Sequence, residues 1–245
     1  MTSSPTPDFE HRAATYDELR PVDENWWEVC DALVREGDLT GRRVLDVGSG
    51  TGNFAAALSE RARVWGVDQS PQMLEVARSR APGVRFKQAT AYELPFKDGW
   101  FERATMWLVV HHLERPRAYS EIRRVLGPDG RIAVATFDPS YFRIFWFRDY
   151  FPSMEEIDLA RFPTRDDFDH ELTAAGFRAP SFTRISQHAT VTREVALERI
   201  RGRHIATFDL ISDDEFHAGV EKAERELPDR FEYRQEWLIA VAGAA

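Results

Sequence analysis

Three alternating glycines stand where an apolar segment ends, and their spacing could bring backbone N–H groups against a ligand. Gly48, Gly50 and Gly52 follow the apolar run 44–47, and an alanine-rich segment, 54–61, comes next. A strand, a glycine-rich turn and a helix in this order place backbone donors and a helix N-terminus at a ligand. Glycine is needed where the chain turns this tightly and where a ligand lies against the backbone. The pattern therefore predicts a site for a nucleoside-bearing cofactor.

Two carboxylates stand beside this turn in the sequence. Asp46 precedes the first glycine by two residues, and Asp68 ends the next short apolar segment, 64–68. An acid at the end of the second strand of such a unit can accept hydrogen bonds from ribose hydroxyls. We therefore expect Asp68 to hold a ribose.

The glycine spacing decides between two kinds of cofactor. A dinucleotide fingerprint, G-x-G-x-x-G, would need its third glycine at position 53, which is Asn53. The loop instead resembles motif I of the class I S-adenosylmethionine (SAM)-dependent methyltransferases, E/D-x-G-x-G-x-G, with Asp46 as its acid. The resemblance implies S-adenosyl-L-methionine as the cofactor and S-adenosyl-L-homocysteine (SAH) as its product. The loop would then face a methionine tail, a sulfonium and an adenosine.

The resemblance extends over about residues 40 to 138 and includes five motifs in order. The segment 69–74 predicts a helix with Ser70 as N-cap and Pro71 at the first helical position. The segment 88–96 resembles the family's G-D-A-x-x-L-P-F, and 121–132 resembles E-x-x-R-V-L-x-P-G-G-x-L. On these motifs the chain is identified as a member of the broad group that contains ubiquinone/menaquinone-type and "methyltransferase 11" enzymes.

The resemblance also implies which residues hold the cofactor. The implied set is Tyr16, Asp46, Gly48, Ser49, Gly50, Gly52, Asp68, Gln69, Met73, Thr90, Ala91 and Trp107. Thr90 departs from the family, which has an aspartate there that usually bonds the adenine amino group. A threonine oxygen can accept the same hydrogen bond, but without the charge. For Tyr16, Met73 and Trp107, plain packing is an equally good interpretation.

The adjacent pair His111 and His112 follows the predicted fourth strand, where this fold places its methyl acceptor. Methyl transfer from a sulfonium is an in-line displacement, so alignment and exclusion of water supply much of the acceleration. A base is needed when the acceptor is a hydroxyl, an ammonium or an acidic carbon, and histidine titrates near neutral pH. Either histidine is a candidate general base, and the alternative is that the pair only shapes the loop.

No metal site is expected. Neighbouring residues on an extended chain point to opposite faces, so the two histidines would make a poor metal pair. Cys30 is the single cysteine, which leaves no thiolate cluster for zinc.

The elements that must position these residues alternate between strand and helix, which predicts an α/β fold with helices on both faces of a parallel sheet. The resemblance implies a three-layer, Rossmann-like sheet of seven strands, mostly parallel, with an antiparallel last strand. The last two strands are expected at 181–186 and 231–241. We expect one methyltransferase domain over 1–245.

Three parts of that domain are candidate substrate-binding elements. They are an N-terminal helical cap (1–36), an aromatic insertion (139–165) and a helical insertion (190–228). The aromatic run 141–151 is apolar nearly all round a helix, so it must be buried on two sides or cover an apolar ligand. This run favours an apolar or aromatic small-molecule acceptor, methylated at oxygen, nitrogen or carbon.

The net charge of −9 argues against a nucleic-acid substrate held by phosphate contacts. No signal-peptide pattern stands at the start and no apolar run reaches about 18 residues, so a cytoplasmic protein without a membrane segment is expected, as a monomer or homodimer. Two alternatives remain at this stage. One is a SAM-binding protein of the same fold that does not transfer methyl groups, and the other is a nicotinamide-dependent oxidoreductase.

Overall fold

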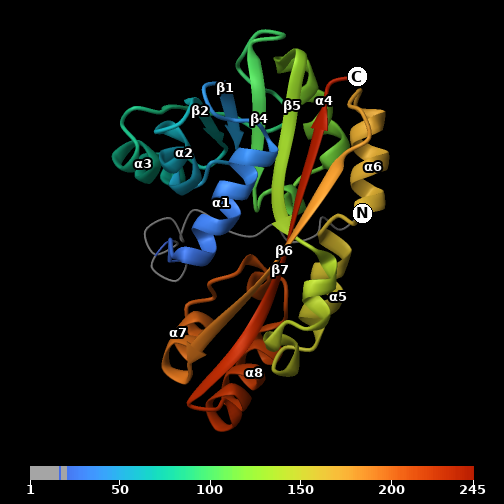
Figure 1. Ribbon diagram of the computed structural model, residues 1–245. Helices are drawn as coiled ribbons and strands as arrows, with labels where there is room; N and C mark the ends of the chain where they lie inside the picture. Colours follow the sequence, from blue (N-terminus) through green and yellow to red (C-terminus); the bar gives the residue numbers. More distant parts are fainter. Residues whose placement is uncertain (1–16, 18–20) are drawn as a thin grey trace.

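A seven-stranded sheet organises the chain, which we describe from a computed structural model covering residue 17 and residues 21–245. Its strand order is β3-β2-β1-β4-β5-β7-β6, and β7 runs antiparallel to both of its neighbours (Figure 1). The strands are β1 (Arg43–Val47), β2 (Arg63–Asp68), β3 (Arg85–Gln88), β4 (Phe101–Trp107), β5 (Leu126–Phe137), β6 (Ser181–Thr192) and β7 (Arg230–Gly243). The predicted mostly parallel sheet with an antiparallel last strand is confirmed.

Apolar side chains alternate between the two faces of the central strands, so both faces need a cover. In β5, Ile132 and Val134 belong to one buried cluster, while Ala133 and Ala135 belong to the other. Residues of α4 and α6 complete the first cluster, and residues of α1 and α2 complete the second. The helices of this part of the chain are α1 (Glu24–Glu36), α2 (Asn53–Ser59), α3 (Pro71–Arg80), α4 (Arg115–Val125) and α6 (Arg165–Ala174). The three-layer α/β class is therefore confirmed.

The start of α3 shows how closely a local pattern can set local structure. Ser70 is its N-cap, and the Ser70 hydroxyl accepts a hydrogen bond from the Met73 backbone N–H. Pro71 occupies the first helical position, where a missing N–H is harmless. Both predictions are confirmed, and the cap fixes the chain direction immediately after Asp68.

The last two strands extend beyond the rest of the sheet. Pairing between β5 and β7 ends at Phe137 and Trp237, but β6 and β7 remain paired as far as Thr192 and Arg230. This ribbon therefore projects past the carboxyl ends of the parallel strands. The elements packed on it are the 3₁₀ turns η2 (Pro139–Arg143), η3 (Trp146–Asp149) and η4 (Ala206–Asp209) and the helices α5 (Ser153–Arg161), α7 (Arg193–Arg201) and α8 (Asp213–Glu226).

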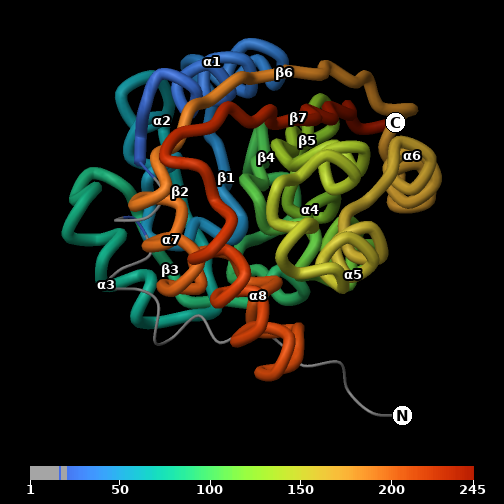
Figure 2. The backbone as a smooth tube through the Cα atoms, turned by 90° about the horizontal axis from the view of Figure 1, so that it is seen from below, coloured from blue at the N-terminus to red at the C-terminus, as the bar shows by residue number. Residues whose placement is uncertain are grey.

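We call this projecting part of the molecule the acceptor lobe. It comprises residues 138–236, except α6 and except the part of β6 that lies within the main sheet. It forms the lower part of the molecule in Figure 1. Figure 2 looks up at it and shows α7 and α5 on its two sides with α8 between them. The predicted end of the sixth strand at position 186 was wrong, because the β-branched run Thr190–Thr192 continues the antiparallel pairing and the helix begins only at Arg193.

The aromatic run 141–151 forms two 3₁₀ turns, η2 and η3, rather than one helix. Phe147 and Phe151 are fully buried in the core of the acceptor lobe, among side chains of α5, η4 and α8. Core packing, one of the two alternatives for this run, therefore holds for these residues. The other alternative depends on what Tyr141 and Phe145 face.

Candidate functional site

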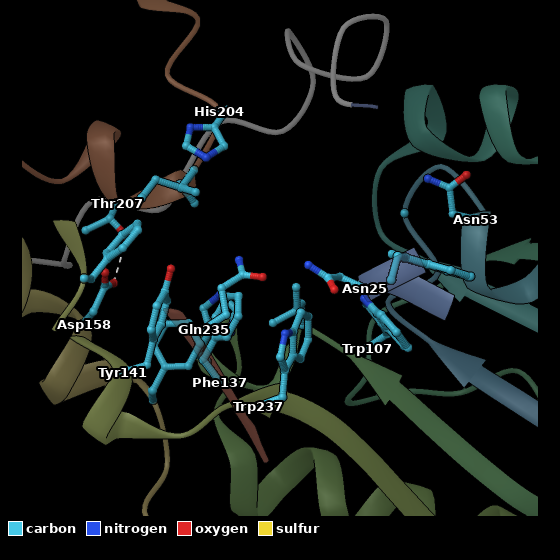
Figure 3. A pocket seen from close by; sticks show the side chains of 18 of the residues that line it. Asn25, Asn53, Trp107, Phe137, Tyr141, Asp158, His204, Thr207, Gln235 and Trp237 are labelled. Carbon is cyan, nitrogen blue, oxygen red and sulfur yellow. Dashed lines mark hydrogen bonds between the residues drawn. The ribbon is translucent and has the colours of Figure 1, made fainter. Parts of the chain in front are cut away.

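A cavity of about 290 Å³ lies at the carboxyl ends of β1, β4 and β5 and continues under the projecting ribbon (Figure 3). One end is lined by the glycine turn, including Asp46, Gly48 and Gly50. The other end is lined by the acceptor lobe, including Tyr141 and Phe145. The carboxyl ends of parallel strands are the usual ligand position in such sheets. The aromatic run thus packs the lobe and also lines the cavity.

The glycine turn presents bare backbone to the cavity. Gly50 has φ +53°, and a Cβ placed on it would meet nothing within 4 Å, so this position is open for a ligand. Gly48 also has a positive φ, and a Cβ there would collide with Val109. Ser49, which also lines the cavity, donates its hydroxyl hydrogen to the Asp46 carbonyl at 3.0 Å and so stiffens the turn.

Gly52 has a different surrounding from the other two glycines. A Cβ on Gly52 would come within 2.9 Å of the Ala77 Cβ, so this glycine lets α2 approach α3 closely. It does not line the cavity among the residues that the structure describes. Gly52, which has φ +81°, therefore serves the packing of α2 against α3.

Asp46 places a buried carboxylate at the cavity wall. Its Oδ1 accepts a hydrogen bond from the Thr105 hydroxyl at 2.9 Å, while its Oδ2 has no hydrogen-bond partner within the described part of the chain. The side chain is only 1% exposed, and this burial raises its pKa to about 6. A buried acceptor with a free oxygen is suited to a cationic group such as an ammonium.

Asp68 holds the glycine turn to the end of β2. Its Oδ2 accepts from the Gly50 N–H and its Oδ1 from the Ser70 N–H, both at 2.9 Å. Burial raises the pKa of this carboxyl as well. The carboxylate is half-buried beside the turn, and it keeps further lone pairs for a ligand such as a diol.

Within the described part of the chain, the cavity is not lined by Asp68 or by the other predicted adenosine contacts. Gln69 and Thr90 are exposed, whereas Met73 and Ala91 are buried, and none of the four lines the cavity in the described part of the structure. They follow the ends of β2 and β3, which are paired there, so they lie on the same side of the turn as Asp68.

An aspartate that sequence analysis left out ties the N-terminal segment to this turn. Asp17 Oδ1 accepts from the Thr51 hydroxyl and from Asn53 Nδ2, each at 2.8 Å, and Asp17 Oδ2 accepts from Arg80 at 2.6 Å. Arg80 also donates to the Thr51 carbonyl. Asp17 directly follows Tyr16, the residue that sequence analysis chose as a cofactor contact, and Tyr16 lies outside the described residues.

Trp107 belongs to an aromatic group at the middle of the cavity. Its ring stacks on Phe54 with centroids 5.2 Å apart and an angle of 24°. Its centroid also lies 5.2 Å from Trp26 and 5.7 Å from Trp237. All four rings line the cavity, so Trp107 connects the glycine turn with the acceptor lobe.

Alternate residues of β7 form one wall of the cavity. Tyr233, Gln235 and Trp237 all line it, because side chains two apart in a strand share a face. Figure 3 labels Gln235 and Trp237 of this wall. Gln187 of the paired strand β6 lines it too. Sequence analysis missed these residues, although polar and aromatic side chains alternate with charged ones along this strand.

The two histidines form the short turn η1 (Val110–His112) after β4, and both line the cavity. His111 stacks on Phe162 with ring centroids 3.9 Å apart and an angle of 14°. The rings of His111 and His112 lie 4.0 Å apart. The expectation that these rings point to opposite faces was wrong, because the chain here is a 3₁₀ turn and not an extended strand.

Arg161 determines the tautomer of His112. A guanidinium NH2 group of Arg161 lies 3.1 Å from His112 Nδ1, and arginine can only donate. His112 Nδ1 must therefore accept, so in the neutral ring the proton is on Nε2. The same guanidinium contacts Asp158 at 3.4 Å, and Asp158 Oδ1 accepts from the Thr207 hydroxyl at 2.7 Å. Burial raises the pKa of Asp158 to about 6.

No three histidine, cysteine or acidic side chains among the described residues gather so as to hold a metal ion. None of their helices is both long and apolar enough to cross a membrane.

Residues 44–130 match a protein family described as "Methyltransferase domain". A 2-phytyl-1,4-naphtoquinone methyltransferase from Trichormus variabilis is 32% identical over 170 residues, which are 61% of this chain and 73% of that enzyme. A demethylmenaquinone methyltransferase from Thermus thermophilus is 41% identical over 106 residues, which are 40% of this chain and 48% of that enzyme. The chain thus spans about half the length of the second relative and nearly three quarters of the first.

Solved structures share the fold over most of the chain. A protein from Anabaena variabilis, described as a methyltransferase of an antibiotic biosynthesis pathway, superimposes with a TM-score of 0.68 at 21% identity, covering 87% of this chain and 96% of that one. A geranyl diphosphate C-methyltransferase from Streptomyces coelicolor, solved with S-adenosyl-L-homocysteine, gives 0.56 at 17% identity, covering 90% and 79%. At these identities the likeness concerns the fold alone.

Proposed function

This chain belongs to the S-adenosylmethionine-dependent methyltransferases, and we propose that it transfers a methyl group from S-adenosyl-L-methionine to a small apolar or aromatic acceptor. One observation carries the proposal. A single cavity is lined by the glycine turn at one end and by the aromatic acceptor lobe at the other, with His111 and His112 also in its wall. Such a cavity can hold a donor and an acceptor in contact.

The residues at the glycine turn fit the methionine end of the cofactor. Gly50 offers an open backbone face, and the free Oδ2 of Asp46 is a buried acceptor for the methionine ammonium. Asp68 would accept from the ribose hydroxyls, while its existing bonds to Gly50 and Ser70 hold it in place. We extend the proposal to Gln69, Met73, Thr90 and Ala91 as the adenine side, on the strength of the motif resemblance.

The aromatic residues would align the acceptor and exclude water. When bound, S-adenosylmethionine supplies an electrophilic methyl group on a good leaving group, so geometry and a dry site provide much of the rate. Trp107, Trp237 and Phe137 all line the cavity, and the Trp237 ring lies 5.7 Å from that of Trp107 and 4.4 Å from that of Phe137. A flat apolar acceptor can lie against these rings.

The two histidines receive different roles in this proposal. His112 already carries its proton on Nε2 because Arg161 donates to Nδ1, so neither nitrogen can accept a proton without breaking that contact. It would donate a hydrogen bond to the acceptor. His111, held against Phe162, would then be the general base that takes the acceptor's proton.

The names of the relatives support an aromatic acceptor. Two of the relatives named above are, by their names, a 2-phytyl-1,4-naphtoquinone methyltransferase and a demethylmenaquinone methyltransferase, and an aromatic-lined cavity suits a quinone ring. The acceptor-lobe residues are not part of the matching family segment, which ends at residue 130. We therefore propose an aromatic acceptor class and leave its ring system to experiment.

Label transfer tests the proposal. The protein would be incubated with SAM tritiated at the methyl group and with the small-molecule fraction of cells that produce it. We expect label in organic-extractable products with wild type and none with Gly50→Leu, whose side chain would fill the open face of the turn. Tight SAH binding without any label transfer would contradict methyl transfer and support the alternative of a SAM-binding protein.

A further inference from the structure

Arg199 of α7 places a guanidinium at the acceptor end of the cavity without a carboxylate to neutralise it. The residue lines the cavity and is half-buried. Its guanidinium donates a hydrogen bond to the Tyr233 hydroxyl oxygen at 3.3 Å. Within the residues that the structure describes, no carboxylate lies within 4.0 Å of its nitrogens.

The other charges near this end of the cavity are already paired. Asp158, which lines the cavity, contacts Arg161 and accepts from Thr207. Arg201, two residues further along α7, points to solvent and pairs with Glu224 at 2.6 Å. Among the described residues of this region, Arg199 is therefore the cation that has no carboxylate partner.

A guanidinium in such a position is costly unless an anion joins it. Burial of a charge without a counter-charge is unfavourable, and aromatic walls cannot replace the lost water. A carboxylate or phosphate oxygen would restore the balance through short, charge-assisted hydrogen bonds. The Tyr233 oxygen accepts from Arg199, so its own hydroxyl hydrogen is available to the same anion.

Gln235 is already engaged and helps to hold this wall in shape. It shares a hydrogen bond with Tyr141, a buried residue that also lines the cavity. Arg199 and Tyr233 therefore stand as two donors beside a fixed aromatic surface.

We propose that the methyl acceptor of this enzyme is an aromatic compound carrying an anionic oxygen group, such as a carboxylate, that binds Arg199 and Tyr233. The inference rests on the proposed function, because it places the acceptor in the same cavity. It goes further by giving the acceptor a charge and an orientation. The anionic group lies at α7, and the ring lies toward Trp237.

The test compares two probes of nearly equal shape, 2-naphthoate and its uncharged amide, 2-naphthamide. Binding to protein saturated with SAH would be followed by quenching of tryptophan fluorescence, since Trp107, Trp146 and Trp237 line the cavity. Calorimetric titration with SAH comes first and tests the cofactor half separately. This order separates failure of the proposed function from failure of the present inference.

We expect wild type to bind the naphthoate at least about tenfold more tightly than the amide. Arg199→Met should reduce the ratio to about one with the amide affinity unchanged, and Arg199→Lys should keep part of the preference. Arg201→Met, from the same helix, is the matched control and should leave the ratio intact.

A second variant keeps the inference falsifiable if Arg199→Met does not fold. Tyr233→Phe should lower the preference a few-fold without changing amide binding. Equal binding of the two probes by wild type, no naphthoate binding at millimolar concentration, or a preference that survives in Arg199→Met would each overturn the anionic acceptor. If SAH binds in those cases, the methyltransferase proposal stands.

Discussion

The two ends of the cavity differ in what lines them, because one presents mainly backbone and the other presents side chains. In the cofactor half, β1–β5 with their helices, the ligand surface is a backbone turn, and the side chains of Asp46 and Asp68 are fixed by Thr105 and by the backbone of the turn. In the acceptor lobe, the surface consists of side chains that project from β7, η2 and α7. A backbone surface depends on a few φ values, whereas a side-chain surface can change one residue at a time. The fold can therefore keep one cofactor while its acceptor changes.

The largest expected effect separates chemistry from binding. With the acceptor identified by label transfer, His111→Ala should lower kcat by about 100-fold or more, because a general base contributes that much. His112→Ala should cost about tenfold, because it removes only a donor held by Arg161. SAH affinity should remain unchanged in both, and exposed His170→Ala is the control. Equal losses in both histidine variants would contradict the assigned roles.

The next effect tests the backbone surface. Gly50→Leu should weaken SAH binding by about 100-fold, since the side chain would occupy the open face of the turn. Gly41→Leu is a matched control, because Gly41 also has a positive φ and open space around it but lies outside the cavity. Both variants should lose stability, whereas only the first should lose SAH in calorimetry. Equal SAH affinity in the two would show that the cofactor does not lie on this turn.

Because of Asp46, we expect the affinity for SAH to depend on pH, and this effect is confined to the cofactor half. Burial raises its pKa from the ordinary 3.8 to about 6, so the apo carboxyl is largely protonated below pH 6 and cannot attract an ammonium. SAH affinity should therefore rise about tenfold between pH 5 and pH 7, and Asp46→Asn should flatten this profile. A steep profile in Asp46→Asn would assign the titration to another group, such as Asp68.

The raised pKa of Asp46 also determines how the stability of the folded state changes with pH. A carboxyl whose folded pKa lies above its unfolded value stabilises the folded state at pH below the unfolded pKa, and that contribution falls as pH rises through about 6. Asp46→Asn should consequently be more stable than wild type at pH 7 by about 1 kcal/mol, in urea unfolding without ligand. Lower stability of Asp46→Asn at pH 7 would mean that its loss of hydrogen bonding outweighs the relief of charge.

The smallest expected effect concerns the N-terminal contact. Asp17→Asn keeps an acceptor for Thr51 but loses the ion pair with Arg80, so SAH affinity should fall only about threefold. Arg80→Met should do the same, and the double variant should be no worse than either single one. Asp31→Asn, which removes a surface ion pair with Arg61, is the control. Additive losses would show that the two residues act separately.

The cofactor half could be predicted from sequence because its geometry is local. A strand, three glycines and a helix follow one another within residues 43–59, and Ser70 with Pro71 specifies the next helix start. The seven-stranded, mostly parallel sheet with its antiparallel last strand came from the family resemblance and is confirmed. The roles of the individual cofactor residues remain predictions.

The acceptor lobe could be predicted only as a collection of aromatic and helical segments. Its wall requires β6 and β7 to pair, although the paired residues are more than thirty positions apart in the sequence. The contact that sets the tautomer of His112 comes from Arg161, which is 49 positions away. No local pattern shows such contacts, because they depend on how the ribbon projects past the sheet. Asp17 was missed for a similar reason, since its partners Thr51, Asn53 and Arg80 lie far along the chain.

A parallel calorimetric titration of wild-type protein with SAH and NADH tests most directly whether the cavity binds an S-adenosyl cofactor. We predict micromolar binding of SAH, strongly weakened in Asp68→Ala, and no binding of NADH, because the turn has Asn53 where a dinucleotide fingerprint needs glycine. Binding of NADH without SAH would contradict the assignment of the cavity and return the nicotinamide alternative.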